Sequence, residues 1–396
     1  MELLRNPIRP YAWGSHTAIA AVQGRHIPTE GPEAELWMGA HPGDPSTVED
    51  GRTLIDVIAE DPDGVLGAAN VRRFGERLPF LFKVLAAEAP LSIQAHPDAA
   101  QARAGFDEED AQGIPVDATV RNYVDPFHKP ELLCAVSEYE CLCGFRDPAE
   151  SAELLARLNV AGLSGTVDLL RQDDPAQALR EAVATVMTVP ETLRGELLGQ
   201  VATACSELAG DGPGGAVYAM AASLGKTYPG DIGVLVALLL NHVVLQPGEA
   251  IYMPAGNAHA YLRGVGVEIM AASDNVLRGG LTGKHVDVPE LLRVLRYEVL
   301  DEPRVAPVEV SPGVREWPTP MPEFRLTRGS VGGLRESVTL HNGGPRILLC
   351  WSGQVRFDDG VQPLTLLPGQ AAFVSAEATG PVVATGFGEF FQASTA

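Results

Sequence analysis

A glutamine and a histidine, Gln94 and His96, stand two residues apart in the apolar stretch "LSIQAHPD". On a β-strand alternate side chains point the same way, with Cα atoms roughly 7 Å apart, so this amide and imidazole can converge on one object. A metal ion is such an object. For an isolated Q-x-H pair the commoner case is two core polar groups satisfied by hydrogen bonds. The interpretation therefore depends on whether further ligands exist.

Lysine is scarce in this chain, with four residues against twenty-five arginines. Arginine evidently serves wherever a generic positive charge is needed. A lysine in this background is a candidate for compact point-charge contact or for proton transfer, which guanidinium does poorly. Three of the four, Lys83, Lys129 and Lys284, lie in segments that also carry candidate polar chemistry.

The overall charge limits the partners of the protein. A formal charge of -22 over 396 residues disfavours nucleic acid and anionic membrane, and an anionic substrate would need a local basic cluster. The longest apolar runs are too short to span a membrane, and the N-terminus lacks the apolar core of a signal peptide. Five cysteines without a C-x-x-C pair argue against a disulfide framework. We expect a cytoplasmic monomer.

The elements that must position these residues change character along the chain. Strand-like segments dominate residues 1–145, with "FLFKVL" and "ELLCAV" as buried strands. Asp147 and Pro148 then form an N-cap and N1 pair that opens an alanine- and leucine-rich helical region. Strand character resumes at "DIGVLVALLLNHVVLQPG". We predict a helical insertion at 146–227 within a β domain made of 1–145 and 228–300, followed by a second β domain at 301–396.

A weak internal repeat supports two β domains of one type. "LQPGEAIYMPA" at 245–255 aligns with "LLPGQAAFVSA" at 366–376. The first copy continues to His259, whereas the second has no histidine at that place. If this histidine is a ligand, the C-terminal domain is a copy without metal.

The segment "GEAIYMPAGNAH" ends at His259 with the spacing G-x5-P-x-G-x2-H, and it resembles the second sequence motif of the cupins. Cupins are small antiparallel jelly-roll barrels, so the resemblance implies a mainly β fold of two such barrels with a helical insertion. Their other ligands are two residues separated by one position, then a glutamate. Gln94, His96 and Glu131 fit that order, and the set suits Zn²⁺, with Mn²⁺, Fe²⁺ or Co²⁺ as alternatives.

Two long motifs resemble the type I mannose-6-phosphate isomerases. "YVDPFHKPE", 123–131, departs from that family's pattern only at Phe127, where asparagine is usual. "HAYLRGVGVEIMAASDNVLRGGLTGK", 259–284, departs at Gly279 and Gly283, where alanine and proline are expected. The openings "YAWGS" and "ELWMGAHP" are also similar, so the resemblance covers nearly the whole chain.

The resemblance implies an enzyme of carbohydrate metabolism and GDP-mannose biosynthesis. It would interconvert mannose 6-phosphate and fructose 6-phosphate through an enediol or enediolate, with one zinc ion per chain in the 1–145 and 228–300 domain. The implied zinc ligands are Gln94, His96, Glu131 and His259, which the spacing suggests as well. The resemblance also places Arg278 in the active site.

Aldose–ketose isomerisation needs a base, an electrophile and a phosphate clamp. Arg278 can donate two parallel hydrogen bonds to a phosphate, and Lys284 can contact it with a compact positive charge. We expect Lys83 or Lys129 to act as a proton carrier with a pKa depressed by the nearby metal. The candidate bases, which the sequence does not rank, are Lys83, Glu268 and Asp274.

Two other functions fit the same motifs. The first is an oxidative metal-dependent cupin of the dioxygenase type, in which the ligand shell activates O₂. The second is a non-catalytic sugar-binding cupin, for which duplicated modules and an acidic surface are equally natural. Turnover without oxygen distinguishes the first from an isomerase, and any turnover excludes the second.

Overall fold

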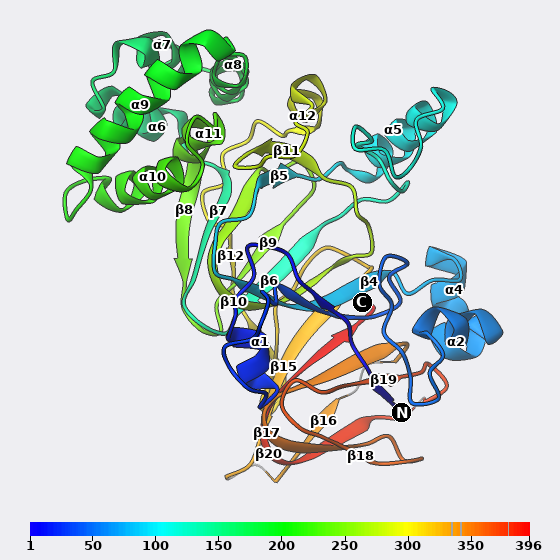
Figure 1. The fold of residues 1–396 in the computed structure, drawn as a ribbon. Coiled ribbons are helices and arrows are strands. Elements are labelled where there is room, and N and C mark those ends of the chain that lie inside the picture. Colours follow the sequence, from blue (N-terminus) through cyan, green and yellow to red (C-terminus); the bar gives the residue numbers. More distant parts are fainter. Residues whose placement is uncertain (334–335, 341–342, 379) are drawn as a thin grey trace.

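The computed structural model describes residues 1–396 except 334–335, 341–342 and 379. It contains two large antiparallel sheets, with a bundle of helices at one end of the molecule and the C-terminal sheet at the other (Figure 1). The predicted mainly β fold with a helical insertion is confirmed. Within the described residues the strand pairings do not close either sheet into a ring.

The first sheet has eleven strands, all from residues 8–305. They are β2 (Ile8–Arg9), β3 (Glu35–Met38), β4 (Phe80–Ala87), β5 (Ile93–Ala95), β6 (Glu131–Ala135), β7 (Tyr139–Phe145), β8 (Leu240–Leu245), β9 (Ala250–Met253), β10 (His259–Ala271), β11 (Leu277–Gly280) and β12 (Arg304–Val305). The two apolar segments predicted as buried strands are β4 and β6, and every residue of both is buried.

The second sheet has nine strands and takes one of them from the N-terminus. They are β1 (Glu2–Leu4), β13 (Val308–Ser311), β14 (Val314–Glu316), β15 (Arg325–Val331), β16 (Ser337–Leu340), β17 (Arg346–Asp358), β18 (Leu364–Leu366), β19 (Ala371–Val374) and β20 (Val382–Ser394). β1 pairs with β19, although we grouped residues 1–145 with the first domain. The repeated segments contain β9 and β19, each followed by a long strand of 13 residues.

The helices include several that the sequence did not reveal. Those of the predicted insertion are α6 (Pro148–Arg157), η1 (Ala161–Leu163), α7 (Ser164–Leu170), α8 (Pro175–Met187), α9 (Glu191–Leu208) and α10 (Gly215–Thr227), and α11 (Gly233–Leu238) follows just beyond its end. Elsewhere lie α1 (Ala18–Val22), α2 (Leu54–Glu60), α3 (Pro62–Leu66), α4 (Ala68–Phe74), α5 (Ala99–Ala111) and α12 (Val288–Val294). The predicted N-cap and N1 pair is confirmed, because the Asp147 carboxylate accepts the backbone N–H groups of Ala149 and Glu150 and Pro148 begins α6.

One prediction for this region is wrong. We expected strand character from Asp231 onward, but 233–238 form α11 and the strand begins at Leu240. The segment is a continuous apolar run buried on all sides, and periodicity cannot separate a buried helix from a buried strand in such a run. The Asp231 carboxylate accepts the Gly233 N–H at 2.7 Å and so favours the helical start.

Apolar packing joins the parts into one body. One buried cluster lies between the two sheets and includes Phe82 and Ile269 from the first and Trp317, Ile347 and Phe391 from the second. Fully burying a side chain of this size is worth about 1.5–3 kcal/mol, so the junction between the sheets is held firmly. In the described part of the chain, no helix is both long and apolar enough to cross a membrane.

Strand β10 is the element that positions the candidate site. Its first half pairs with β5 and β7, and its second half pairs with β4 and β6. The strand therefore bends between two parts of the first sheet. It brings its own candidate residues, His259 and Glu268, beside those of three neighbours: Lys83 of β4, Gln94 of β5 and Glu131 of β6.

Candidate active site and metal centre

The candidate ligands come together through the pairing of β10 with its neighbours. His259 lies opposite Gln94 of β5, and Met270 lies opposite Glu131 of β6. His259 Nε2 is 3.1 Å from Glu131 Oε2, and His96 Nε2 is 3.3 Å from Glu131 Oε1. The ligand atoms of these two histidines and the glutamate all lie within 4.8 Å of one another, and all three residues are buried.

The fourth predicted ligand reaches the same point. The carboxamide nitrogen of Gln94 is 3.2 Å from His259 Nε2. A half-turn of the amide presents its oxygen there instead, because the two ends of the group are nearly the same size. The structure therefore brings together all four residues that the spacing suggested.

Hydrogen bonds hold both imidazoles in the orientation that a metal requires. Nδ1 of His96 lies 2.7 Å from the carbonyl oxygen of Asn275, and Nδ1 of His259 lies 3.1 Å from that of Asn257. Each Nδ1–H can donate to its carbonyl, which leaves Nε2 as the free lone pair. The buried His96 Nε2 has no hydrogen-bond partner among the described residues. An orphaned buried nitrogen beside a carboxylate fits a metal site.

The electrostatics favour the protonation states of metal ligands. Burial, and then the charge of Lys129, lower the pKa of His96 to about 4, so the ring is neutral at pH 7. Burial opposes ionisation of Glu131, but Lys129, at 3.1 Å, and the two imidazoles outweigh it and hold the pKa of this carboxyl well below its usual range. Two imidazoles, a carboxylate and an amide oxygen suit Zn²⁺.

Phe127, which departs from the usual motif, keeps its loop in place by a different contact. The guanidinium carbon of Arg77 lies 3.4 Å from the centre of the Phe127 ring. The Phe127 carbonyl accepts from Ser273 Oγ at 3.0 Å and from Asn275 Nδ2 at 2.8 Å. Since the carbonyl of Asn275 accepts from His96, this loop is joined directly to a candidate ligand.

Replacing Phe127 with alanine is expected to weaken zinc binding about tenfold, because outer groups that orient a ligand typically contribute 10–100-fold to metal affinity. Competition with a chelating dye measures the zinc dissociation constant. The matched control is Phe106→Ala, which removes a ring beneath another arginine, Arg121, away from these hydrogen bonds. Equal affinities in wild type and Phe127→Ala would contradict the role given to this ring.

A pocket of about 650 Å³ opens beside the metal cluster. Several predicted residues line it: Lys83, Gln94, Lys129, Asp274, Arg278 and Lys284. It is also lined by side chains that the sequence reading missed: Arg9, Tyr11, Trp13, Glu35, Trp37, Tyr228 and Thr282. The mixture of charged groups, aromatic rings and hydroxyls is suited to a small polar substrate.

Two cations stand in this pocket without a counter-charge. Among the described residues, neither Arg278 nor Lys284 takes part in an ion pair. Burial lowers the pKa of Arg278, and burial together with the charge of Arg278 lowers the pKa of Lys284. In a chain of net charge -22, two unpaired cations that line one pocket are suited to binding an anion.

Lys83 lies between two buried carboxylates. It stands opposite Trp37 of β3 on one side and Glu268 of β10 on the other. Its Nζ is 3.5 Å from Glu268 and 3.7 Å from Glu35. Burial favours the neutral amine, but these carboxylates outweigh it and raise the Lys83 pKa, which is opposite in direction to the depression expected beside a bound metal. Burial, and then the charge of Glu131, raise the pKa of Glu268 to about 7.

Asp274 is the most exposed of the candidate bases, with 52% of its side chain accessible. Its Oδ1 lies 3.5 Å from Nε2 of the buried His41, and its backbone N–H donates to Asp125. Glu268, by contrast, is 2% exposed, and its Oε1 has no hydrogen-bond partner among the described residues. The three candidate bases therefore occupy different environments: an exposed carboxylate, a buried carboxyl and a buried ammonium.

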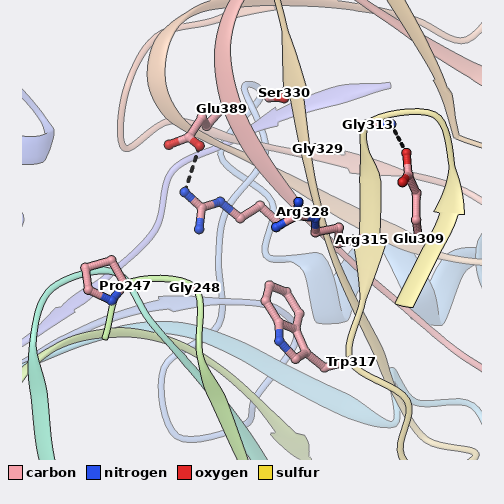
Figure 2. Close-up of a pocket in the computed structure, with 10 residues that line it drawn as sticks. All are labelled: Pro247, Gly248, Glu309, Gly313, Arg315, Trp317, Arg328, Gly329, Ser330 and Glu389. Carbon is pink, nitrogen blue, oxygen red and sulfur yellow. Dashed lines mark hydrogen bonds and ion pairs between the residues drawn. The ribbon is translucent and has the colours of Figure 1, made fainter. Parts of the chain in front are cut away.

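A second hollow, of about 420 Å³, lies where the turn between β8 and β9 meets the C-terminal sheet (Figure 2). None of the ten residues that line it is a predicted site residue. Arg328 is neutralised there by Glu389 at 2.7 Å, and the indole of Trp317 forms part of the core between the sheets. This hollow belongs to the junction between the two sheets and lies apart from the chemistry.

Glu35 is the clearest residue that sequence reasoning missed. It stands in the apolar strand "AELWM", where its Oε2 accepts from Trp37 Nε1 at 2.5 Å and faces Lys83. An acidic residue inside a fully buried strand is costly unless it is paired, and that was the available signal. The partner could not be identified, because Lys83 is 48 residues away in sequence.

Comparison with known proteins agrees with this site. Residues 1–148 match the model of the phosphomannose isomerase type I catalytic domain. The chain is 39% identical to mannose-6-phosphate isomerase of Escherichia coli, across 98% of each chain, and 31% identical to that of Emericella nidulans, across 96% of this chain and 92% of the other.

Solved structures agree over the whole chain. A point mutant of phosphomannose isomerase from Salmonella typhimurium superposes with a TM-score of 0.92 and 36% identity, covering 100% of this chain and 99% of that one. A zinc-bound mannose 6-phosphate isomerase superposes with a TM-score of 0.90, 36% identity and the same coverage. This chain belongs to the type I phosphomannose isomerase family.

Proposed function

We propose that the protein is a zinc-dependent isomerase that interconverts mannose 6-phosphate and fructose 6-phosphate by proton transfer through an enediolate. The single observation that supports this most is the buried cluster of His96, Glu131 and His259 beside a pocket that contains two unpaired cations. A metal site and an anion site then serve one small substrate. The names of the relatives agree with this activity.

Gln94, His96, Glu131 and His259 would hold the zinc ion. When bound, zinc supplies a positive charge that stabilises negative charge on the O1 and O2 oxygens of the substrate. The protein side chains around it are 1–3% exposed, apart from Gln94, which reaches the pocket. A dry environment strengthens each electrostatic contact to the reacting atoms.

Arg278 and Lys284 would bind the phosphate. Arg278 lies opposite Gln94 in the pairing of β11 with β5, so the phosphate contact and a metal ligand are on adjacent strands. Arginine supplies a planar pair of donors and lysine a point charge. A phosphate held on the strand next to a metal ligand would orient the sugar chain toward the metal cluster.

Lys83 and Glu268 would carry the proton transfer. Lys83 lines the pocket and can donate to the developing oxyanion. Glu268 contacts Lys83 and, with a pKa of about 7, exchanges a proton readily near neutral pH. Asp274 is expected to contribute less, since its carboxylate is more exposed. Lys129, held by Glu131, would stabilise charge at the metal side of the pocket.

The alternatives have less support. An oxidative cupin or a non-catalytic sugar-binding cupin would not need a phosphate clamp beside the metal, and the relatives from Escherichia coli and Emericella nidulans are isomerases. A coupled assay tests the proposal: fructose 6-phosphate should form from mannose 6-phosphate with or without oxygen, stop with a chelator and return with zinc. Absence of turnover in zinc-loaded protein would exclude the proposed activity.

Replacing Lys284 with alanine should raise the KM for mannose 6-phosphate about 10–100-fold, because a charge-assisted hydrogen bond contributes about 1.5–3 kcal/mol. Zinc content should stay the same. The matched control is Lys226→Ala, a lysine in the last turn of α10 that does not line the pocket. An equal loss of affinity for phosphorylated and unphosphorylated mannose would contradict the clamp.

We also propose the finer organisation expected from the sequence. The helical insertion at 146–227 would be one unit, the β segments at 1–145 and 228–300 the catalytic unit, and 301–396 a unit without metal. A monomeric state and a cytoplasmic location remain predictions, which size-exclusion chromatography and cell fractionation would test.

A further inference from the structure

The loop that follows β11 has a conformation that needs support. Leu281 has φ = +56°, although it is not glycine, and its side chain is 1% exposed. The left-handed region is uncommon for a branched residue and persists where the surroundings impose it. Thr282, Gly283 and Lys284 follow directly and line the pocket. The position of the proposed phosphate contact therefore depends on what holds this loop.

One carboxylate just before helix α11 holds it. Asp231 precedes α11, and its Oδ1 accepts the Gly233 N–H at 2.7 Å. Its other oxygen, Oδ2, accepts the Thr282 N–H at 3.0 Å. Asp231 thus joins the start of a helix to the loop 281–284, about fifty residues away along the chain.

Close packing supports the same contact. A Cβ atom added to Gly280 would lie 2.5 Å from Gly233 Cα, so β11 and α11 touch backbone to backbone. The Leu281 side chain belongs to the buried cluster of the helical insertion, together with Leu235 and Leu239. Tyr228, just before this segment, lines the pocket and donates its hydroxyl to the Pro90 carbonyl at 2.7 Å. The segment that follows the helical insertion, from Tyr228 to α11, therefore forms one wall of the pocket.

We propose that Asp231 is a positioning residue that sets the loop 281–284 for binding the substrate phosphate. The segment 228–238, which connects the helical insertion to β8, thereby contributes to the selection of phosphorylated sugars. This inference rests on the proposed function, in which Arg278 and Lys284 contact the phosphate. Asp231 itself does not touch the substrate.

The negative charge of Asp231 and its two hydrogen bonds, which tether the loop 281–284 to α11, predict opposite effects on phosphate affinity. A negative charge near a phosphate site repels the ligand, so its removal alone would tighten binding. Loss of the tether frees the loop and weakens binding. Asn has a single oxygen, so Asp231→Asn can accept only one of the two N–H groups and turns an amide nitrogen toward the other. This variant removes the charge and half of the tether.

The experiment compares Asp231→Ala and Asp231→Asn with wild type, all loaded with zinc. Both should raise the KM for mannose 6-phosphate, by about tenfold for alanine and less for asparagine. The kcat and the zinc content should stay within about twofold. Inhibition by inorganic phosphate, which needs no turnover of the probe, should weaken in parallel. The matched control is Asp174→Ala, which removes a cap with two backbone N–H partners at α8 and should change none of these.

A lower KM in either variant would show that only the charge acts and would overturn the tether. An unchanged KM, or a fall in kcat and zinc content with an unchanged KM, would also overturn it. If Asp231→Ala does not fold, as judged by thermal unfolding, the milder Asp231→Asn decides. A wild type without isomerase activity refutes the proposed function itself. If Lys284→Ala raises the KM and neither Asp231 variant does, only the tether is wrong.

Discussion

Replacing His259 with alanine is expected to remove zinc and activity together. His259 supplies one of the two imidazoles in the buried cluster and lies opposite Gln94 in the sheet. Losing a ligand from a four-residue shell leaves three protein ligands and a cavity, so zinc content in dialysed protein should fall well below one per chain. The loss of Lewis-acid stabilisation, several kcal/mol, should reduce kcat/KM by about 10³-fold or more.

Metal analysis and the coupled assay on the same sample test this prediction. His242→Ala is the matched control, because His242 pairs with Glu140 at 2.8 Å and lies outside the cluster. Gln94→Ala should show the same effects in smaller measure, since a neutral amide oxygen is the weakest of the four ligands. Full zinc occupancy in both variants would show that the ligand set is wrong.

Replacing Glu268 with glutamine should lower kcat about 10²–10⁴-fold while zinc content stays unchanged, because the amide keeps the shape of the carboxyl but cannot exchange a proton. Glu268 is 2% exposed and contacts Lys83, so the substitution leaves the pocket surface almost unaltered. Asp274→Asn is the comparison, and its effect should be clearly smaller. A larger effect of Asp274→Asn would show that the base is the exposed Asp274 carboxylate and not the buried Glu268.

The pH dependence gives an independent measurement of the same group. Burial raises the pKa of Glu268 to about 7, and a base must be ionised to accept a proton. The rate should therefore be near its plateau above pH 8 and fall about tenfold per pH unit below pH 6. In Glu268→Gln this acid limb should disappear from the residual activity. An identical acid limb in the variant would assign it to another group.

The acidic composition of the protein helps to distinguish the roles proposed for its pocket cations. With a net charge of -22, most cations are expected to have carboxylate partners. Lys83 and Lys129 do, at 3.5 Å and 3.1 Å, whereas Arg278 and Lys284 do not in the part of the chain that the structure describes. In the proposed function, the paired cations would act at the metal and the unpaired cations would bind the substrate phosphate.

The metal-site residues could be chosen from sequence because their pattern is local. Gln94 and His96 share one face of a strand by alternation, and the glycine–proline spacing before His259 belongs to a recognisable turn. The order of ligands in the cupins added Glu131 to the candidate metal set, and the resemblance to the type I mannose-6-phosphate isomerases placed Arg278 in the active site. The mainly β fold and the start of the helical insertion at Asp147 were also readable, because N-caps and strand runs are short-range signals.

Contacts between residues that are distant in the sequence could not be predicted from it. The segment 233–238 was predicted as strand, because an apolar run reads the same in a buried helix. β1 joined the far sheet by pairing with β19, and no local pattern announces such a partner. The pKa of Lys83 was predicted to be depressed, but Glu35, from a strand with no recognised chemistry, raises it together with Glu268.

The amino-acid sequence by itself determined which side chains can hold a metal and a phosphate, since those depend on residue type and on spacing within a few positions. Only the tertiary structure decided which charges are paired, which carboxyl has a pKa near neutrality, and which distant helix end holds the loop at Thr282. Electrostatic and packing effects depend on distances through space, and those distances exist only after β10 has brought its neighbours together.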